Sequence, residues 1–104
     1  MSSREKYEEE AARLARLPRA ERFEALIEFP TAHMFKVIGR AAGFVEAIEQ
    51  TLIAAGHPGV ALMHRPSSQG KFLSLTFTLQ VASGAELDQL YTLLEGVSGL
   101  AYIL

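Results

Sequence analysis

The sequence predicts an α+β domain with an antiparallel sheet, preceded by a helical arm. Residues 71–82 alternate apolar and polar side chains, which is typical of a strand with one buried face. Two segments with helical apolar spacing, within 44–55 and 84–95, alternate along the chain with strand-like runs. A short polar loop, 66–70, joins two of these runs as in a hairpin.

The N-terminal arm is expected to contain two helices. Residues 3–17 carry apolar side chains at spacings of three and four, and Pro18 then suits the first position of a second helix. Pro30 disfavours helical geometry at the residue before it and ends the arm. Because the arm has many charges and few large apolar residues, we assign 1–28 to a helical extension and 29–104 to the domain.

The first half of the domain reads as strand, helix, strand. Residues 33–39 form the first strand, and a helix with a broad apolar stripe then opens at Gly43 and ends at Gly56. Residues 60–65 form the second strand, which the loop 66–70 turns back.

The second half of the domain is expected to repeat the order strand, helix, strand. The third strand covers about 71–82, and its strict alternation determines its register. Ser83 and Glu86 form a capping box at the start of the next helix, Gly96 ends that helix, and 100–104 form a short final strand.

This element order, β-α-β-β-α-β, indicates a ferredoxin-like fold. Two right-handed split β-α-β units give a four-stranded antiparallel sheet with both helices on one face. The expected structure is therefore a ferredoxin-like sandwich with an extra N-terminal helical arm.

The length, composition and charge of the chain exclude several classes of protein and of functional site. The chain has 104 residues, which fits one domain, and it has no cysteine, which excludes disulfides and a cysteine nucleophile. It shows no apolar leader and no apolar run of about 18 residues, so we expect a cytoplasmic protein that does not cross a membrane. The net charge of −2 differs from the strongly basic character of dedicated nucleic-acid binders.

The charges of the domain are expected to be segregated. After residue 30 the cations fall on predicted strands or their connections, and the acids fall on predicted helices. The cations are Lys36, Arg40, Arg65 and Lys71, and the acids are Glu46, Glu49, Glu86, Asp88 and Glu95.

Several separate blocks of the sequence resemble a family of small bacterial proteins. The blocks are 28–30 (Glu-Phe-Pro), 36–39 (Lys-Val-Ile-Gly), 65–74 (Arg-Pro-Ser-Ser-Gln-Gly-Lys-Phe-Leu-Ser) and the terminal Leu104. In this order and spacing they resemble the YbeD-like family of unknown function, over roughly residues 26–104. Gln69 and Phe72 stand where a lysine and a tyrosine are typical of that family.

The resemblance implies a ferredoxin-like fold similar to ACT regulatory domains. ACT domains often bind small ligands, commonly amino acids, at interfaces between paired domains. Their ligand loop follows the first strand and carries Asp, Pro and Gly. The corresponding loop here, 39–44, keeps glycines but has no Asp or Pro.

Catalysis, metal binding and cofactors are not expected. The chain has a single aspartate, and its three histidines lie on different segments. Asp88 is explained by the helix dipole near the start of a capped helix, and no pair of histidines or carboxylates has a recognised ligand spacing. His33 and His64 would approach each other if their strands were neighbours, but we prefer to interpret them as exposed strand histidines.

The candidate binding residues lie on the hairpin and the first strand. They are Lys36, Arg65, Ser67, Ser68, Lys71 and Phe72. The loop differs from a phosphate-binding P-loop, because an arginine replaces its first glycine and the loop leads into a strand. Two interpretations remain: a local turn with Gly70 at positive φ, or a weak site for a carboxylate or phosphate.

Two functions are compatible with these observations. The first is a non-catalytic regulatory or binding module that acts through self-association, a protein partner or a small anionic ligand. The alternative is single-stranded RNA or DNA binding through the open sheet face, where we identify one aromatic, Phe72.

Overall fold

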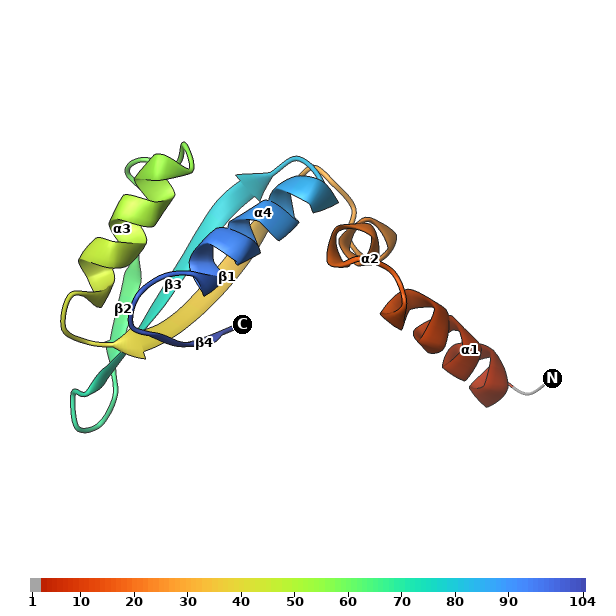
Figure 1. Ribbon diagram of the computed structural model, residues 1–104, viewed down its shortest axis with the longest axis horizontal. Helices are drawn as coiled ribbons and strands as arrows, with labels where there is room; N and C mark the ends of the chain where they lie inside the picture. The colour runs from red at the N-terminus through yellow and green to blue at the C-terminus, as the bar shows by residue number, and fades with distance from the viewer. Residues whose placement is uncertain (1–2) are drawn as a thin grey trace.

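A four-stranded antiparallel sheet and four helices make up the described part of the chain, residues 3–104 of the computed structural model (Figure 1). The helices are α1 (Ser3–Ala15), α2 (Arg19–Leu26), α3 (Phe44–Ala54) and α4 (Gly84–Glu95). The strands are β1 (Thr31–Arg40), β2 (Met63–Pro66), β3 (Phe72–Val81) and β4 (Leu100–Ile103), in the spatial order β2-β3-β1-β4. The predicted α+β class and antiparallel sheet are confirmed.

The two long central strands determine the register of the sheet. β1 pairs with β3 over ten residues, from Thr31 opposite Val81 to Arg40 opposite Phe72. The edge strands are short: β2 pairs with β3 over four residues, and β4 pairs with β1 with a shift in register next to Gly39. Short and irregular edges limit the backbone available for unwanted strand pairing.

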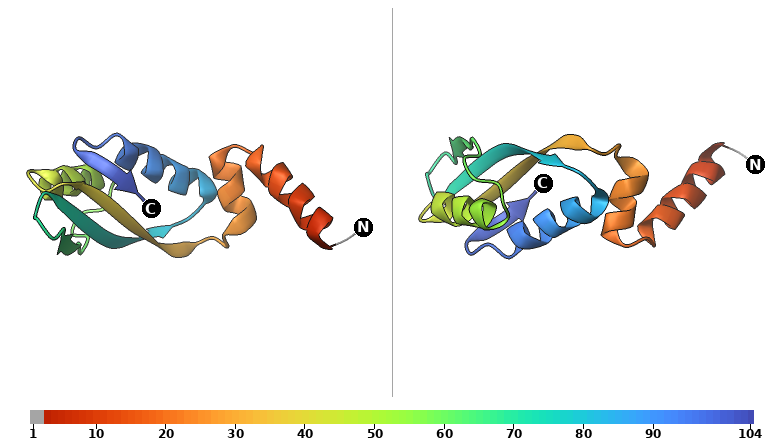
Figure 2. Two further views of the ribbon diagram at one scale, coloured as in Figure 1. Left: turned by 90° about the horizontal axis from the view of Figure 1, so that it is seen from below. Right: turned by 90° about the horizontal axis from the view of Figure 1, so that it is seen from above.

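The hydrophobic core lies between one face of the sheet and the helices α3 and α4, which both cover that face (Figure 2). Its buried side chains come from alternate positions of β1 and β3 and from one stripe of each helix. They are Phe35, Val37, Phe44, Ile48, Leu52, Leu75, Phe77, Leu79, Val81, Leu87, Leu90 and Leu94. The alternation read from residues 71–82 therefore gives the correct buried face.

Local sequence signals explain how the elements begin. The Ser83 hydroxyl accepts a hydrogen bond from the N–H of Glu86 at 3.2 Å, as the capping box predicts. Gly39 is required for a different reason: a Cβ atom there would lie 2.4 Å from the ring of Phe44. The first turn of α3 can pack on β1 only because residue 39 has no side chain.

The two helices of the arm differ in how they contact the domain. α1 has no buried residue and extends away from the sheet, whereas α2 packs against α4 (Figure 1). Arg19 on α2 pairs with Asp88 (Nε–Oδ1 2.5 Å) and Glu95 (Nη1–Oε1 2.9 Å) on α4. The ring of Phe23 stacks on that of Tyr91, with centroids 5.7 Å apart. Asp88 therefore does more than complement the dipole of its own helix.

The strand order corrects the interpretation of two histidines. β3 lies between β1 and β2, so His33 and His64 do not approach each other. His33 is half-buried on the core side of the sheet, not exposed, and its Nε2 lies 3.0 Å from the hydroxyl oxygen of Tyr91. Burial lowers the pKa of His33 from its ordinary value.

Within residues 3–104, no helix has the length and apolar character needed to cross a bilayer.

Candidate functional site

The face of the sheet opposite α3 and α4 is not covered by any helix of the described part (Figure 2). We call it the open face. Pairing in the sheet assigns to it the side chains that alternate with the core residues. They are Met34, Lys36, Ile38 and Arg40 from β1, Met63 and Arg65 from β2, Phe72, Ser74, Thr76, Thr78 and Gln80 from β3, and Tyr102 from β4.

Cross-strand pairing arranges these side chains in rows. One row contains Arg65, Ser74, Ile38 and Tyr102, because each of these residues pairs with the next. The neighbouring row is formed by Met63, Thr76 and Lys36. Directly opposite residues have Cβ atoms about 5 Å apart, so each row places cationic, hydroxyl and apolar groups side by side.

A shallow depression of about 230 Å³ lies at one end of the open face. Its lining contains four of the six predicted site residues, Lys36, Arg65, Ser67 and Phe72, and adds Ile38, Pro66 and Ser74. The remaining two predicted residues, Ser68 and Lys71, do not line it and are exposed at the hairpin tip. The structure thus brings together the three strand residues of the predicted site and Ser67 of the loop.

The hairpin loop closes on itself through hydrogen bonds. The backbone groups of Ser67 and Phe72 pair (N–O 2.9 Å), and the Ser67 hydroxyl accepts from the Phe72 N–H at 3.2 Å. The Gly70 N–H donates to the Ser67 carbonyl at 3.0 Å, with Gly70 at φ 72°. The turn interpretation is therefore correct for these backbone groups, and an anion near the loop would depend mainly on the side chains of Arg65 and Lys71.

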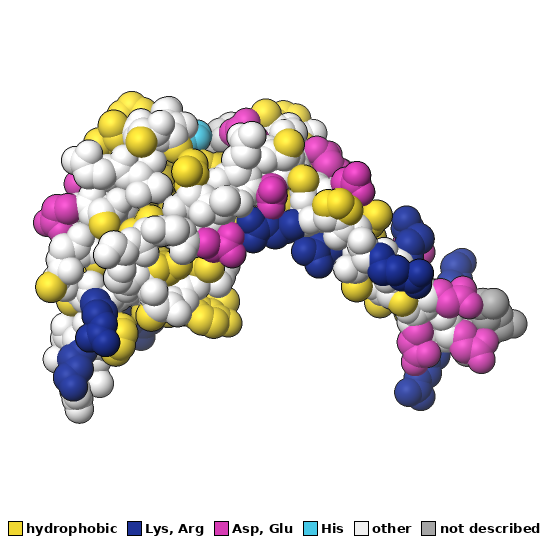
Figure 3. Space-filling model, viewed as in Figure 1, with side chains coloured by type: hydrophobic (Ala, Val, Ile, Leu, Met, Phe, Trp, Pro, Cys, Tyr) yellow, Lys and Arg dark blue, Asp and Glu magenta, His cyan; other side chains and the backbone are white. Residues whose placement is uncertain are grey.

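The open face is positively charged. None of the four strands of the described sheet contains Asp or Glu, whereas the acids after residue 30 lie on α3 and α4 as predicted. Figure 3, which views the helix side of the molecule, shows Lys and Arg side chains near the β2–β3 hairpin and on the arm, and Asp and Glu side chains over α3 and α4 and on the arm. Lys36, Arg65 and Lys71 form no ion pair with any residue in 3–104.

Sequence reasoning missed part of the open face. Tyr102 is 58 % exposed and pairs with Ile38, so the face has a second aromatic besides Phe72. Met63 is 72 % exposed on the edge strand, and the guanidinium of Arg40 lies 6.0 Å from the centroid of the Phe72 ring. Identifying Tyr102 requires the strand order and the register of β4, which its short segment does not encode by itself.

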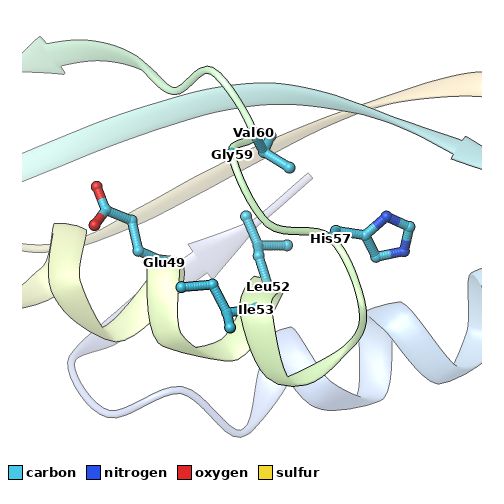
Figure 4. A pocket seen from close by; sticks show the side chains of 6 residues that line it. All are labelled: Glu49, Leu52, Ile53, His57, Gly59 and Val60. Carbon is cyan, nitrogen blue, oxygen red and sulfur yellow. The ribbon is translucent and has the colours of Figure 1, made fainter.

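A second, smaller cavity of about 100 Å³ lies between the end of α3 and the loop to β2 (Figure 4). It is lined by Glu49, Leu52, Ile53, His57, Gly59 and Val60. The side chains of Glu49 and His57 point away from each other, so they do not form an acid–base pair (Figure 4). Across residues 3–104, no three His, Asp or Glu side chains are placed to hold a metal ion.

A solved structure has the same general architecture. The solution structure of protein HP0495 from H. pylori matches with a TM-score of 0.64 and 18% sequence identity, covering 75% of this chain and 85% of that one. At this identity the similarity concerns the fold alone.

Relatives of similar size are found in bacteria. UPF0250 proteins from Shewanella halifaxensis and Janthinobacterium sp. are 32% and 38% identical over 87 and 85 residues. The alignments cover 80% and 78% of this chain and 96% and 92% of the relatives. A UPF0250 protein from Leptothrix cholodnii is 39% identical over 79 residues, covering 72% of this chain and 86% of the relative.

The family model "Protein of unknown function (DUF493)" matches residues 24–104, from the second turn of α2 to Leu104. The match agrees with the span of the YbeD-like resemblance and confirms it. The chain therefore belongs to the DUF493 family, whose function is unknown.

Proposed function

We propose that this protein is a non-catalytic regulatory or binding module that recognises its partner through the open face. The occupant would be a second copy, another protein or a small anionic ligand. One observation carries the proposal: an uncovered sheet face combines exposed apolar side chains with cations that have no carboxylate partner in the described chain. Methionine, aromatic residues and arginine are the types enriched in protein interfaces.

The chemistry of the depression favours binding over catalysis. Lys36 and Arg65 supply positive charge, and Ser67 and Ser74 supply hydroxyl donors. Its lining residues include no carboxylate or imidazole, the commonest general bases, whereas they offer several donors to an anion.

The finer description of the fold belongs to the same proposal. The strand order β2-β3-β1-β4, with α3 and α4 on one face, supports a ferredoxin-like module formed by residues 29–104. The exposed α1 supports treating residues 1–28 as an extension. The absence of cysteine fits a cytoplasmic protein.

The first experiment compares open-face variants with matched controls. Lys36→Glu and Met34→Glu alter the open face. As controls, Lys6→Glu on α1 makes the same charge reversal, and Leu93→Glu on α4 replaces another exposed apolar residue by glutamate. Sedimentation over a wide concentration range measures self-association, and thermal shift with phosphate and carboxylate compounds measures anion binding. The open-face pair should weaken whichever interaction is found by about tenfold, and the controls should not.

A protein that stays monomeric, shows no thermal shift with anions and captures no lysate partner in an open-face-dependent manner would overturn this proposal. Equal losses in the open-face and control variants would overturn the placement on the open face.

Nucleic-acid binding through the same face is the second candidate. The observation that favours it is the pair of exposed aromatics, Phe72 and Tyr102, beside Lys36 and Arg65. Such binding would weaken steeply with salt and would be lost in Lys36→Glu. Flat titrations with single-stranded RNA and DNA at low salt would remove this candidate.

A further inference from the structure

We infer that the occupant of the open face is an acidic, amphipathic segment of a partner protein. This inference rests on the proposed function and selects one of its possible occupants. It follows from the charge of the face, the position of its central cation, the surroundings of its aromatics and the shape of its depression.

The charge of the open face requires a negatively charged partner. Lys36, Arg40 and Arg65 belong to this face, Lys71 lies at its end, and the strands contribute no acid. Lys36 is half-buried on a central strand, so a partner lying across the sheet would desolvate its ammonium group. An opposite charge on the partner is then needed to offset that cost.

A second copy does not supply that charge in face-to-face packing. A symmetric dimer presents the same patch on both subunits, so each copy would bring the same cations to the interface. Lys36 lies on β1, one of the two central strands, and would face a positively charged surface. Like charges in an interface suppress association.

The aromatics of the open face favour a protein segment over nucleic acid. Single-stranded nucleic acids bind through successive bases stacked on exposed aromatic rings. Here the Arg40 guanidinium lies 6.0 Å from the centroid of Phe72, and Tyr102 lies on the edge strand on the far side of β1. Between them the face carries Ile38 and Ser74, which offer no stacking platform.

The remaining apolar side chains suit an aliphatic partner. Met34 and Met63 are 67 % and 72 % exposed, and methionine adapts to irregular apolar surfaces. The lining of the depression combines Lys36 and Arg65 with the apolar side chains of Ile38, Pro66 and Phe72. This arrangement fits a carboxylate side chain next to an apolar anchor on the same segment.

The size of the face suits one helix or one extended segment. Four strands span about 14 Å between the axes of the edge strands. A helix of about 14 residues is about 21 Å long, which is enough to cross all four strands. Two synthetic amphipathic peptides of about this length are suitable probes. Both carry the same leucine and methionine stripe, with glutamate at the polar positions of one and lysine at those of the other.

Fluorescence anisotropy with the full-length protein then measures binding of the two peptides and of a single-stranded oligonucleotide. The glutamate peptide should bind at least about tenfold more tightly than the lysine peptide, with an affinity that falls as salt rises. Lys36→Glu and Arg65→Glu should each reduce that affinity by about tenfold, and Lys6→Glu should leave it unchanged. Far-UV circular dichroism of each variant checks that the fold is retained.

Each of the other outcomes contradicts the inference on the partner, the proposed function or both. Equal binding of the two peptides, or tighter binding of the oligonucleotide, overturns the inference on the partner. Open-face-dependent self-association without peptide binding also overturns it, but leaves the proposed function standing. If no peptide, oligonucleotide, anion, second copy or lysate partner binds in a way that depends on the open face, the inference and the proposed function both fail.

Discussion

Replacement of Gly84 by alanine is expected to destabilise the protein, although it introduces a better helix former. Gly84 is the first residue of α4 and is buried. A Cβ atom there would lie 2.3 Å from the carbonyl oxygen of Ala20 and 2.8 Å from Cγ of Glu24, both on α2. The first contact is with backbone, so a change of side-chain rotamer cannot relieve it.

Two effects of opposite sign determine the magnitude. Helix propensity alone would stabilise the alanine variant by about 0.5–1 kcal/mol. Against this, overpacking costs about 1–3 kcal/mol, and displacement of α2 also stretches the hydrogen bond from the Gly84 N–H to Oε1 of Glu24, now 2.7 Å. A charge-assisted bond of this kind contributes about 1.5–3 kcal/mol, so we expect a net loss of about 1–3 kcal/mol in the free energy of unfolding.

Urea unfolding followed by far-UV circular dichroism measures this loss, and hydrogen exchange of α2 amides reports whether α2 separates from α4. Gly96→Ala is the control, because a Cβ atom at Gly96 meets nothing closer than 3.6 Å. The control should change stability by less than about 0.5 kcal/mol. A Gly84→Ala protein as stable as the wild type, or more stable, would refute the tight packing of α2 on α4.

Three further predictions concern the core, a helix cap and a titrating group. Leu75→Ala, at a fully buried position, should lower the free energy of unfolding by about 2–5 kcal/mol in urea titrations. Ser83→Ala removes the acceptor for the Glu86 N–H and should lower it by about 1 kcal/mol in the same assay. Burial lowers the pKa of His33, so below about pH 6.5 the unfolded chain takes up a proton more readily than the folded protein. Stability should therefore fall as the pH drops from about 7 to 5, and His33→Gln should flatten that dependence.

Control measurements test whether these changes in stability are specific to the mutated positions. Leu93→Ala removes an exposed leucine from α4 and should be nearly neutral, unlike Leu75→Ala. If the free energy of unfolding of the wild-type protein rose as the pH was lowered from about 7 to 5, the direction assigned to the pKa of His33 would be contradicted.

The sheet and the two domain helices were predictable because their signals are local. Alternation along 71–82 gives the faces of β3, and the serine and glutamate of the capping box determine where α4 begins. The predicted bounds of the second strand, 60–65, were the least accurate, because β2 begins at Met63 and ends at Pro66. This edge strand has exposed side chains on both faces, so burial imposes no pattern on it.

The docking of α2 and the full open face were not predictable from local patterns. Arg19 meets Asp88 across 69 residues of sequence, and neither residue lies in a motif that indicates the other. Tyr102 belongs to the open face only because β4 pairs with β1 in the observed register. Of the predicted site, Lys36 and Arg65 line one depression because both of their strands pair with β3, an arrangement that depends on topology.

The central claim is that the open face recognises an acidic amphipathic partner. Its most direct test is the affinity of the glutamate peptide for the wild-type protein and for Lys36→Glu, measured by anisotropy beside the lysine peptide. The account predicts tighter binding of the glutamate peptide and a loss of about tenfold in Lys36→Glu but not in Lys6→Glu. Equal affinities for both peptides, or equal losses in both variants, would contradict it.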